Sequence, residues 1–401
     1  MQLRGRFKLK IYFLILNIYG MGGTVRTVLN ITNYLAEKGY DVEIISVFRR
    51  QGRPFFNINP KIKITVIHDL VDRNRRNARD FRSLISRFLE KIPSLLIHKD
   101  EESYKQFSLL TDLKLYLHLK TITDGILVST RPCFNLFVSK FANKNVILVG
   151  QEHVNFQSHP PALKKAIKKN YKNLDYLITL TEKDNENYMD IFAGERVKIR
   201  KITNSVNQIN TKLEKSPLNE KVVIAAGRLD WVKGYDLLIE AFQYVVEKHP
   251  DWKLKIFGSG KERENLANLI QEKKLYNNVF LMGSTKELAK ELMKSSIFVV
   301  SSRMEGFGLV IAEAMQCGVP VVSFDCPHGP SEVINDGEDG ILVENGNIKK
   351  LGEAINRLIE NEDLRKEMGK KAYVNVKRFS VENIGRQWED FFNKLGAKKL
   401  N

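Results

Sequence analysis

Short apolar runs alternate with amphipathic segments along most of the chain. The first run covers residues 11–16, and a glycine-rich stretch follows it. The next segment places its apolar residues on one helical face and ends at Gly39, before a second run, VEIISVF. This order of strand, loop, helix and strand is typical of a parallel sheet with right-handed crossovers. The pattern therefore predicts an α/β fold.

The alternation passes through two cycles. The first resumes with strands at 145–150, 174–180 and 197–202. The second consists of VVIAAG, LKIFG, NVFLMG, SIFVVSS, VPVVSF and GILVE, with helical segments between them. The intervening stretch, NQINTKLEKSPLNEK, is polar, contains proline and lacks periodicity, as linkers do. We therefore predict two Rossmann-like domains, 1–208 and 220–379, joined by a linker at 209–219.

The final segment, 380–401, has the pattern of an amphipathic helix. Ser380 is suited to be its N-cap, and aromatic residues follow at spacings of three and four, at Trp388, Phe391 and Phe392. The sequence does not determine which surface this helix packs on.

Composition adds a strong charge bias to this picture. The 401 residues are 43% hydrophobic and 28% charged, which is typical of a globular protein, and the net charge is +17. Such a charge favours an anionic partner, which leaves a phosphate-rich substrate, an anionic membrane surface and nucleic acid open. Nucleic acid has only the charge in its favour, because the sequence has no zinc-ligand spacing, RNP-like aromatic strand or basic zipper.

The cysteines and the N-terminal residues indicate in which cellular compartment the protein is expected. The three cysteines have neither metal-ligand spacing nor the even count of a disulfide framework, so we expect a reducing cytoplasm and no zinc. The basic and apolar start resembles a secretory signal, but Asn17 interrupts it early and no small-residue cleavage site follows. No run reaches the ~18 apolar residues of a membrane span.

Open α/β sheets bind ligands beyond the carboxyl ends of their strands, so the loops after strands are the places to search. Gly22 and Gly23 follow the first strand and open a helix whose free N–H groups suit a phosphate; a plain tight turn is the alternative. Arg228 and Lys233 lie in one glycine-bounded loop and can together neutralise a diphosphate. Their alternative role is as solvated loop cations.

A third loop carries two carboxylates. Glu313 is the only charge in the apolar stretch 306–324, which reads as a buried helix, a glycine cap at Gly318 and a buried strand. A polar ligand explains it, and a structural ion pair is the alternative. Glu305 precedes the helix and could accept hydrogen bonds from the hydroxyls of a sugar. The alternative is a solvated loop carboxylate. Gly306 and Gly308 allow the backbone to approach a ligand closely.

These residues together resemble the family 4 retaining glycosyltransferases of the two-domain GT-B architecture. The motifs that carry the resemblance are Gly227-Arg228 with Lys233-Gly234, the Glu305-x7-Glu313 pair, and Glu332 with Asp336-Gly337 and Gly340. The resemblance implies that Arg228 and Lys233 bind the donor diphosphate, that Glu313 binds the ribose, and that Glu305 with the backbone of Phe307, Gly308 and Leu309 binds the donor sugar.

The resemblance also assigns a histidine and a reaction. His153 follows a strand where the family has a histidine that contacts donor-sugar hydroxyls; His159 and His328 are its rivals, and a solvated loop histidine is the alternative. The implied catalytic residues are thus His153, Glu305, Arg228 and Lys233, with retention by front-face attack and with no metal or other cofactor.

The implied substrates are a nucleotide sugar, bound by the domain 220–379, and a glycan, lipid-linked or polyanionic acceptor, bound by the domain 1–208. UDP is the nucleotide that the resemblance favours, with GDP and ADP open, and the sugar is a hexose or N-acetylhexosamine. The segment 325–332 is similar to bacterial members that build cell-surface polysaccharides, glycolipids or teichoic acids. A sugar-nucleotide epimerase of GT-B shape is the runner-up, although the glutamate pair argues against it.

Two basic segments suggest where the enzyme works. Residues 73–91 and 163–172 both combine cations with apolar residues at helical spacing. Either segment could lie on the anionic inner face of the cell membrane or attract an acceptor rich in phosphate. The alternative is that both helices pack on the core and only their charged faces are solvated.

Overall fold

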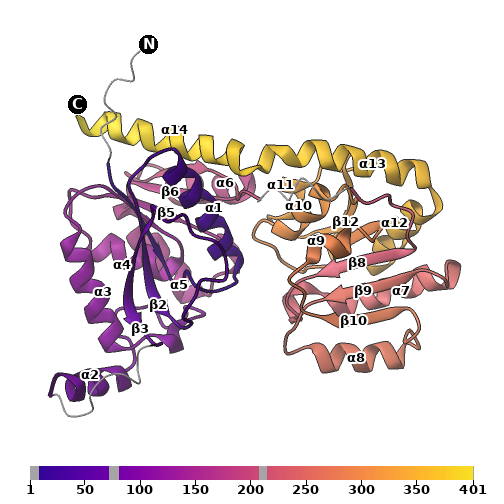
Figure 1. Ribbon diagram of the computed structural model, residues 1–401, viewed down its shortest axis with the longest axis horizontal. Coiled ribbons are helices and arrows are strands. Elements are labelled where there is room, and N and C mark those ends of the chain that lie inside the picture. Colours follow the sequence, from indigo (N-terminus) through magenta and orange to yellow (C-terminus); the bar gives the residue numbers. More distant parts are fainter. Residues whose placement is uncertain (1–8, 72–80, 207–214, 401) are drawn as a thin grey trace. The chain divides into compact units, whose positions relative to one another are not determined.

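The computed structural model describes residues 9–71, 81–206 and 215–400 (Figure 1). The chain forms two compact units, of which unit 1 comprises residues 1–205 and 384–401 and unit 2 comprises residues 206–383. Residues 207–214 lie outside the described part of the chain and include 209–214, which are most of the predicted linker. Residues 72–80 also lie outside it and include 73–80 of the first basic segment. Each unit is described by itself below.

Unit 1 is built on a parallel sheet with the strand order β3-β2-β1-β4-β5-β6-β7 among the described residues. The strands are β1 Ile11–Ile15, β2 Val42–Arg49, β3 Lys63–Asp69, β4 Ile126–Ser129, β5 Ile147–Gln151, β6 Tyr176–Thr179 and β7 Lys198–Lys201. The helices are α1 Gly23–Glu37, α2 Phe81–Lys91, α3 Leu109–Thr121, α4 Pro132–Phe141, α5 Pro161–Asn170, α6 Glu182–Ile191 and α14 Val381–Leu400.

Unit 2 repeats this plan with the strand order β10-β9-β8-β11-β12-β13. Its strands are β8 Val222–Ala226, β9 Lys253–Phe257, β10 Val279–Gly283, β11 Ile297–Val300, β12 Val321–Asp325 and β13 Gly340–Glu344. Its helices are α7 Tyr235–Lys248, α8 Arg263–Glu272, α9 Leu288–Leu292, α10 Leu309–Gln316, α11 Pro330–Val333, α12 Ile348–Glu360 and α13 Glu362–Asn375.

The predicted strands are all present, and two strands were missed. β3 lies at the edge of the sheet and is mostly half-buried, so its sequence lacks a clear apolar run. β4 is fully buried but only four residues long, and so short a run cannot be distinguished from a buried loop by periodicity. The second omission matters for the site, because the loop after β4 carries functional groups.

The structure supplies the packing partner of the C-terminal helix α14. Ser380 accepts a hydrogen bond from the backbone N–H of Asn383, as the predicted N-cap should. The ring of Phe13 in β1 lies 6.5 Å from that of Trp388 and 6.4 Å from that of Phe392, both edge-on. The aromatic stripe therefore completes the core of unit 1.

Both sheets reverse their direction of strand addition next to their first strand. The reversal falls between β1 and β4 in unit 1 and between β8 and β11 in unit 2. In such sheets the loops that leave the two central strands diverge and open a crevice at the carboxyl ends of the strands. The fold therefore directs attention to the loops after β1 and β4, and to those after β8 and β11.

Candidate active site

In unit 2, the loops after β8 and β11 lie against each other. Gly234 has a φ of 62° and a Cβ at this position would lie 2.1 Å from the carbonyl oxygen of Ser301, so only glycine fits here. The hydroxyl of Ser301 donates to the carbonyl of Lys233 over 3.0 Å. This close approach brings the predicted diphosphate loop to the predicted sugar loop.

The two loops share a direct ion pair. Lys233 Nζ lies 2.5 Å from Glu305 Oε1, and the hydroxyl of Ser302 donates to the same oxygen over 2.7 Å. The side chains of Lys233 and Glu305 are only 20% and 10% exposed. Neither residue is thus the solvated loop charge that the sequence left open as an alternative.

Arg228 differs from Lys233 in its surroundings. Its side chain is 74% exposed, and its nearest ion-pair partner is Asp230, with 3.3 Å between Nη2 and Oδ2. Arg228 therefore matches the solvated alternative in this structure, although its position in the loop after β8 leaves its guanidinium accessible to an anion.

A second ion pair, which the sequence did not predict, braces the same loops. Arg303 donates from both terminal nitrogens to the carboxylate of Asp236, over 2.9 and 2.6 Å, and also to the carbonyl of Trp231 over 2.8 Å. Burial alone would raise the pKa of Asp236, but the hydrogen bonds and the charge of Arg303, together with backbone hydrogen bonds, outweigh it and hold that pKa below its usual value. The Arg303 side chain thus links the loop after β11 to the start of α7.

The helix that carries Glu313 has the predicted form. α10 begins after Gly308, which has a φ of 83°, and is followed by Gly318 with a φ of 71° and then by β12. Phe307 is buried against the ring of Phe379, and Glu313 is half-buried in the second turn of the helix. Gly329 lies so close to Glu305 that an added Cβ would be 2.6 Å from the Glu305 Cβ.

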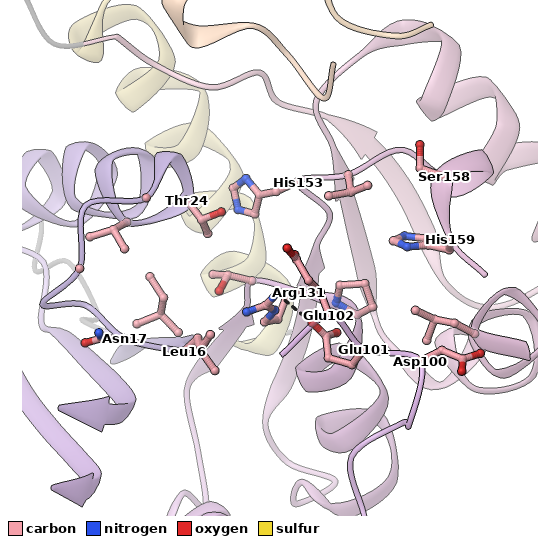
Figure 2. A pocket seen from close by; sticks show the side chains of 18 of the residues that line it. Leu16, Asn17, Thr24, Asp100, Glu101, Glu102, Arg131, His153, Ser158 and His159 are labelled. Carbon is pink, nitrogen blue, oxygen red and sulfur yellow. Dashed lines mark ion pairs between the residues drawn. The ribbon is translucent and has the colours of Figure 1, made fainter. Parts of the chain in front are cut away.

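In unit 1, the crevice at the reversal point is a cavity of about 550 Å³ (Figure 2). Its lining comes from the loops after β1, β4 and β5, from residues 100–102, and from the starts of α1 and α5. Gly22 borders it and caps α1 with an ordinary φ of −66°, and nothing lies within 4 Å of an added Cβ. The turn itself therefore does not demand a glycine at 22. Gly23 is the first residue of α1.

His153 lines this cavity and so does its rival His159, whereas His328 belongs to unit 2. The Nε2 atom of His153 is buried and has no hydrogen-bond partner among the described residues. Burial, assisted by the charge of Arg131, lowers the pKa of His153 to about 4. The imidazole is therefore neutral at pH 7, so one of its ring nitrogens can donate a hydrogen bond and the other can accept one.

The loop that bears both histidines is anchored at several points. The buried carboxylate of Glu152 accepts hydrogen bonds from the Asn135 amide, over 2.9 Å, and from the Tyr171 hydroxyl. The N–H of Phe156 donates to Asp184 Oδ1 over 3.0 Å. Because the Glu152 side chain and the Phe156 backbone are both held, the loop between them is anchored at its two ends.

The cavity also contains charged residues that sequence reasoning missed. Arg131, in the loop after β4, pairs with the buried Glu101 at 2.8 Å, and Asp100 and Glu102 flank that glutamate. The search of loops after strands would have found Arg131 if β4 had been recognised. The acidic segment had no such signal, since residues 100–102 follow no strand.

Two features of the described residues bear on metals and membranes. Among them, no group of three or more His, Cys, Asp or Glu side chains is arranged to hold a metal ion. The helices of the described chain also include none that is long and apolar enough to span a bilayer.

Comparisons with known proteins identify the family. Residues 206–375 match the family model of the glycosyl transferases group 1. An uncharacterized glycosyltransferase from Haemophilus influenzae is 30% identical over 386 residues, which cover 95% of this chain and 99% of that protein. The chain belongs to the glycosyltransferases. This membership supports the transferase reading over the epimerase and nucleic-acid alternatives.

Other relatives of this glycosyltransferase are longer proteins. The exopolysaccharide phosphotransferase SCO2592 of Streptomyces coelicolor is 32% identical over 98% of this chain, but the chain spans only 41% of its length. A poly(ribitol-phosphate) alpha-N-acetylglucosaminyltransferase of Staphylococcus aureus is 34% identical over 69% of this chain and 56% of its own.

A solved structure confirms the fold class. A crystal structure of a variant of S. aureus TarM, in complex with fondaparinux, alpha-GlcNAc-glycerol and UDP, superposes with a TM-score of 0.75. The match covers 96% of this chain and all of that one at 23% identity. The predicted GT-B architecture of two Rossmann-like domains with parallel sheets is therefore correct.

Proposed function

We propose that this glycosyltransferase transfers a hexose or N-acetylhexosamine from a UDP-sugar, with retention and without a metal, as family 4 enzymes do. The acceptor is a cell-surface glycan, a lipid-linked sugar or a teichoic-acid-type polymer. The observation that carries the proposal is the ion pair of Lys233 and Glu305, shielded from solvent where the loops after β8 and β11 meet. The relatives named for polymer glycosylation, and the UDP in the TarM complex, support the substrates.

The proposed roles follow from the chemistry of each side chain. Lys233 and Arg228 stabilise the negative charge that develops on the departing diphosphate, the task that metal ions perform in other phosphate-transfer enzymes. Glu313 binds the ribose hydroxyls. Glu305, with the backbone from Gly306 to Leu309, binds the donor sugar, and Gly22 and Gly23 offer backbone N–H groups to the donor.

Retention in this proposal does not require a covalent intermediate. Glu305 Oε1 already accepts from both Lys233 and Ser302, so this carboxylate is engaged in positioning rather than held free for attack. We therefore propose front-face attack by the acceptor hydroxyl. His153, neutral at pH 7, contributes contacts to hydroxyls of the donor sugar.

A nucleotide-sugar panel tests this function. The purified full chain is incubated with UDP-, GDP- and ADP-sugars and a bacterial membrane extract, with and without EDTA, and products are analysed by mass spectrometry and NMR. We expect transfer from a UDP-sugar in EDTA, with the anomeric configuration of the donor kept. Failure of every nucleotide sugar to bind or react would refute the proposal, and an inverted product would refute its mechanism.

The two basic segments differ in how they would meet a membrane. On α5, Leu163 and Ile167 are buried and Lys165, Lys168 and Lys169 are exposed, so this helix matches the core-packing alternative. On α2, the described apolar side chains Leu84, Ile85 and Phe88 are 54%, 45% and 65% exposed. Arg87 and Lys91 are exposed on the same helix. We assign anionic lipid as the partner of α2, because its cations and apolar groups together suit that surface.

Removal of the apolar groups of α2 should release the enzyme from vesicles. The double variant Leu84→Ser/Phe88→Ser is expected to bind phosphatidylglycerol vesicles at least ~10-fold more weakly, since a buried Leu or Phe side chain contributes about 1.5–3 kcal/mol. Co-sedimentation measures the binding. Tyr276→Ser, at an exposed position of unit 2, is the matched control. Equal binding of the wild type to uncharged phosphatidylcholine vesicles would contradict the assignment.

A further inference from the structure

The cavity of unit 1 has the opposite charge character to the chain as a whole. Among the described residues, its lining contains the carboxylates of Asp100, Glu101 and Glu102 and only one permanent cation, Arg131. None of the described lysines lines it, although the chain has a net charge of +17. The positive surface is therefore not what a ligand meets inside this cavity.

The single cation is already engaged. Arg131 Nη2 lies 2.8 Å from Glu101 Oε1, and Glu101 Oε2 accepts a hydrogen bond from the backbone N–H of Cys133 over 3.3 Å. Asp100 and Glu102 are exposed, and neither forms an ion pair with another described residue. A phosphate that entered the cavity would thus meet two uncompensated carboxylates, whereas a hydroxyl can donate to either of them.

An independent observation indicates that a ligand with hydroxyls is received here. His159 is 8% exposed, lines the cavity, and has a buried Nε2 with no hydrogen-bond partner among the described residues. Glu152 Oε2, also buried and unpartnered, is 3.8 Å from that nitrogen, too far for a hydrogen bond. Buried polar atoms are normally satisfied, so the His159 imidazole is available to a ligand group.

The positions of these side chains separate two sides of the cavity. Figure 2 shows His159, Ser158 and Asp100 on one side, and Thr24 and His153 on the other. His153 is the residue proposed above to contact the donor sugar. The side with His159 and Asp100 is therefore free for the second substrate.

We propose that this side of the cavity binds the acceptor through an uncharged polyol or sugar, with His159 bonding a hydroxyl, and that Asp100 and Glu102 keep phosphate groups out. Any phosphates of a polymer acceptor lie outside the cavity, where the basic surface can attract them. This inference rests on the proposed function, since it names the acceptor class of the same enzyme.

Binding of matched probes to the full chain tests the proposal without turnover. Glycerol and ribitol are compared with glycerol 3-phosphate and ribitol 5-phosphate by saturation-transfer NMR titration. We expect the phosphorylated probes to bind at least ~10-fold more weakly than their neutral counterparts. His159→Ala should weaken the neutral probes by a similar factor. Tighter binding of the phosphorylated probes, or no effect of His159→Ala, would overturn the proposal.

Charge variants separate local from global electrostatics. Asp100→Asn/Glu102→Gln should tighten binding of the phosphorylated probes ~10-fold and change that of the neutral probes far less, because the amide oxygens still accept a hydrogen bond from a hydroxyl. Glu186→Gln/Asp190→Asn makes the same charge change at exposed sites of α6 outside the cavity and should have no such effect. Equal effects of the two double variants would overturn the proposal. Because no donor is present, these outcomes are independent of whether the nucleotide-sugar panel succeeds.

Discussion

Replacement of Lys233 by alanine should lower kcat/KM for the nucleotide sugar by about 10³-fold, the loss typical of removing one preorganised charge from a transition state. Two effects combine. The variant loses the cation that stabilises the leaving diphosphate. It also leaves Glu305, which is 10% exposed, with only the hydroxyl of Ser302 as a partner, so that an uncompensated carboxylate faces the diphosphate.

Steady-state kinetics and UDP titration calorimetry measure this loss. Lys349→Ala, which removes a 72% exposed lysine from the surface of the same unit, should stay close to the wild type. A double-mutant cycle with Glu305→Gln should show strong non-additivity, because the two residues share one ion pair. A loss of less than about tenfold for a folded Lys233→Ala protein would contradict the role assigned to the lysine.

His153→Ala is expected to reduce kcat by about 100-fold through the loss of a hydrogen bond to the reacting sugar. The residue lines the cavity, is half-buried and has an unpartnered Nε2. His118→Ala is a matched control. His118 also has an unpartnered buried Nε2 and a pKa lowered by burial, but it lies on α3 and does not line the cavity. An equal loss in the two variants would show that the effect is structural.

The lowered pKa of His153 gives this prediction a pH signature. Because the pKa lies at about 4 in the folded protein, the imidazole stays neutral between pH 7 and pH 5, so its titration should not reduce kcat there. In the unfolded chain the pKa is near 6.5, and the unfolded state therefore binds the proton first as the pH falls. The free energy of unfolding should thus decrease from about pH 6.5 towards pH 4. His153→Gln should flatten that slope in thermal melts, and an unchanged slope would contradict the burial of the imidazole.

Much of the fold was predictable because local pattern reports it directly. Buried parallel strands are continuous apolar runs, and the helix of Glu313 has its glycine neighbours at Gly308 and Gly318, where the chain needs positive φ. β4 and β3 were missed for opposite reasons, since one is too short and the other too exposed at its sheet edge. Because β4 was missed, so was Arg131, which is the only permanent cation that the described part of the chain contributes to the lining of the unit 1 cavity.

The sequence by itself determined the α/β class, the two repeats, and the loops where Arg228, Lys233 and the two glutamates lie, because these depend on periodicity and on position after a strand. Tertiary structure decided which charges meet. The pairing of Lys233 with Glu305, the clamp of Arg303 on Asp236 and the engagement of Arg131 by Glu101 each join residues from separate segments. Ion pairs and pKa values depend on distances and burial, which only the folded chain sets. The acidic character of the cavity within a strongly basic protein likewise depends on which residues the fold brings together.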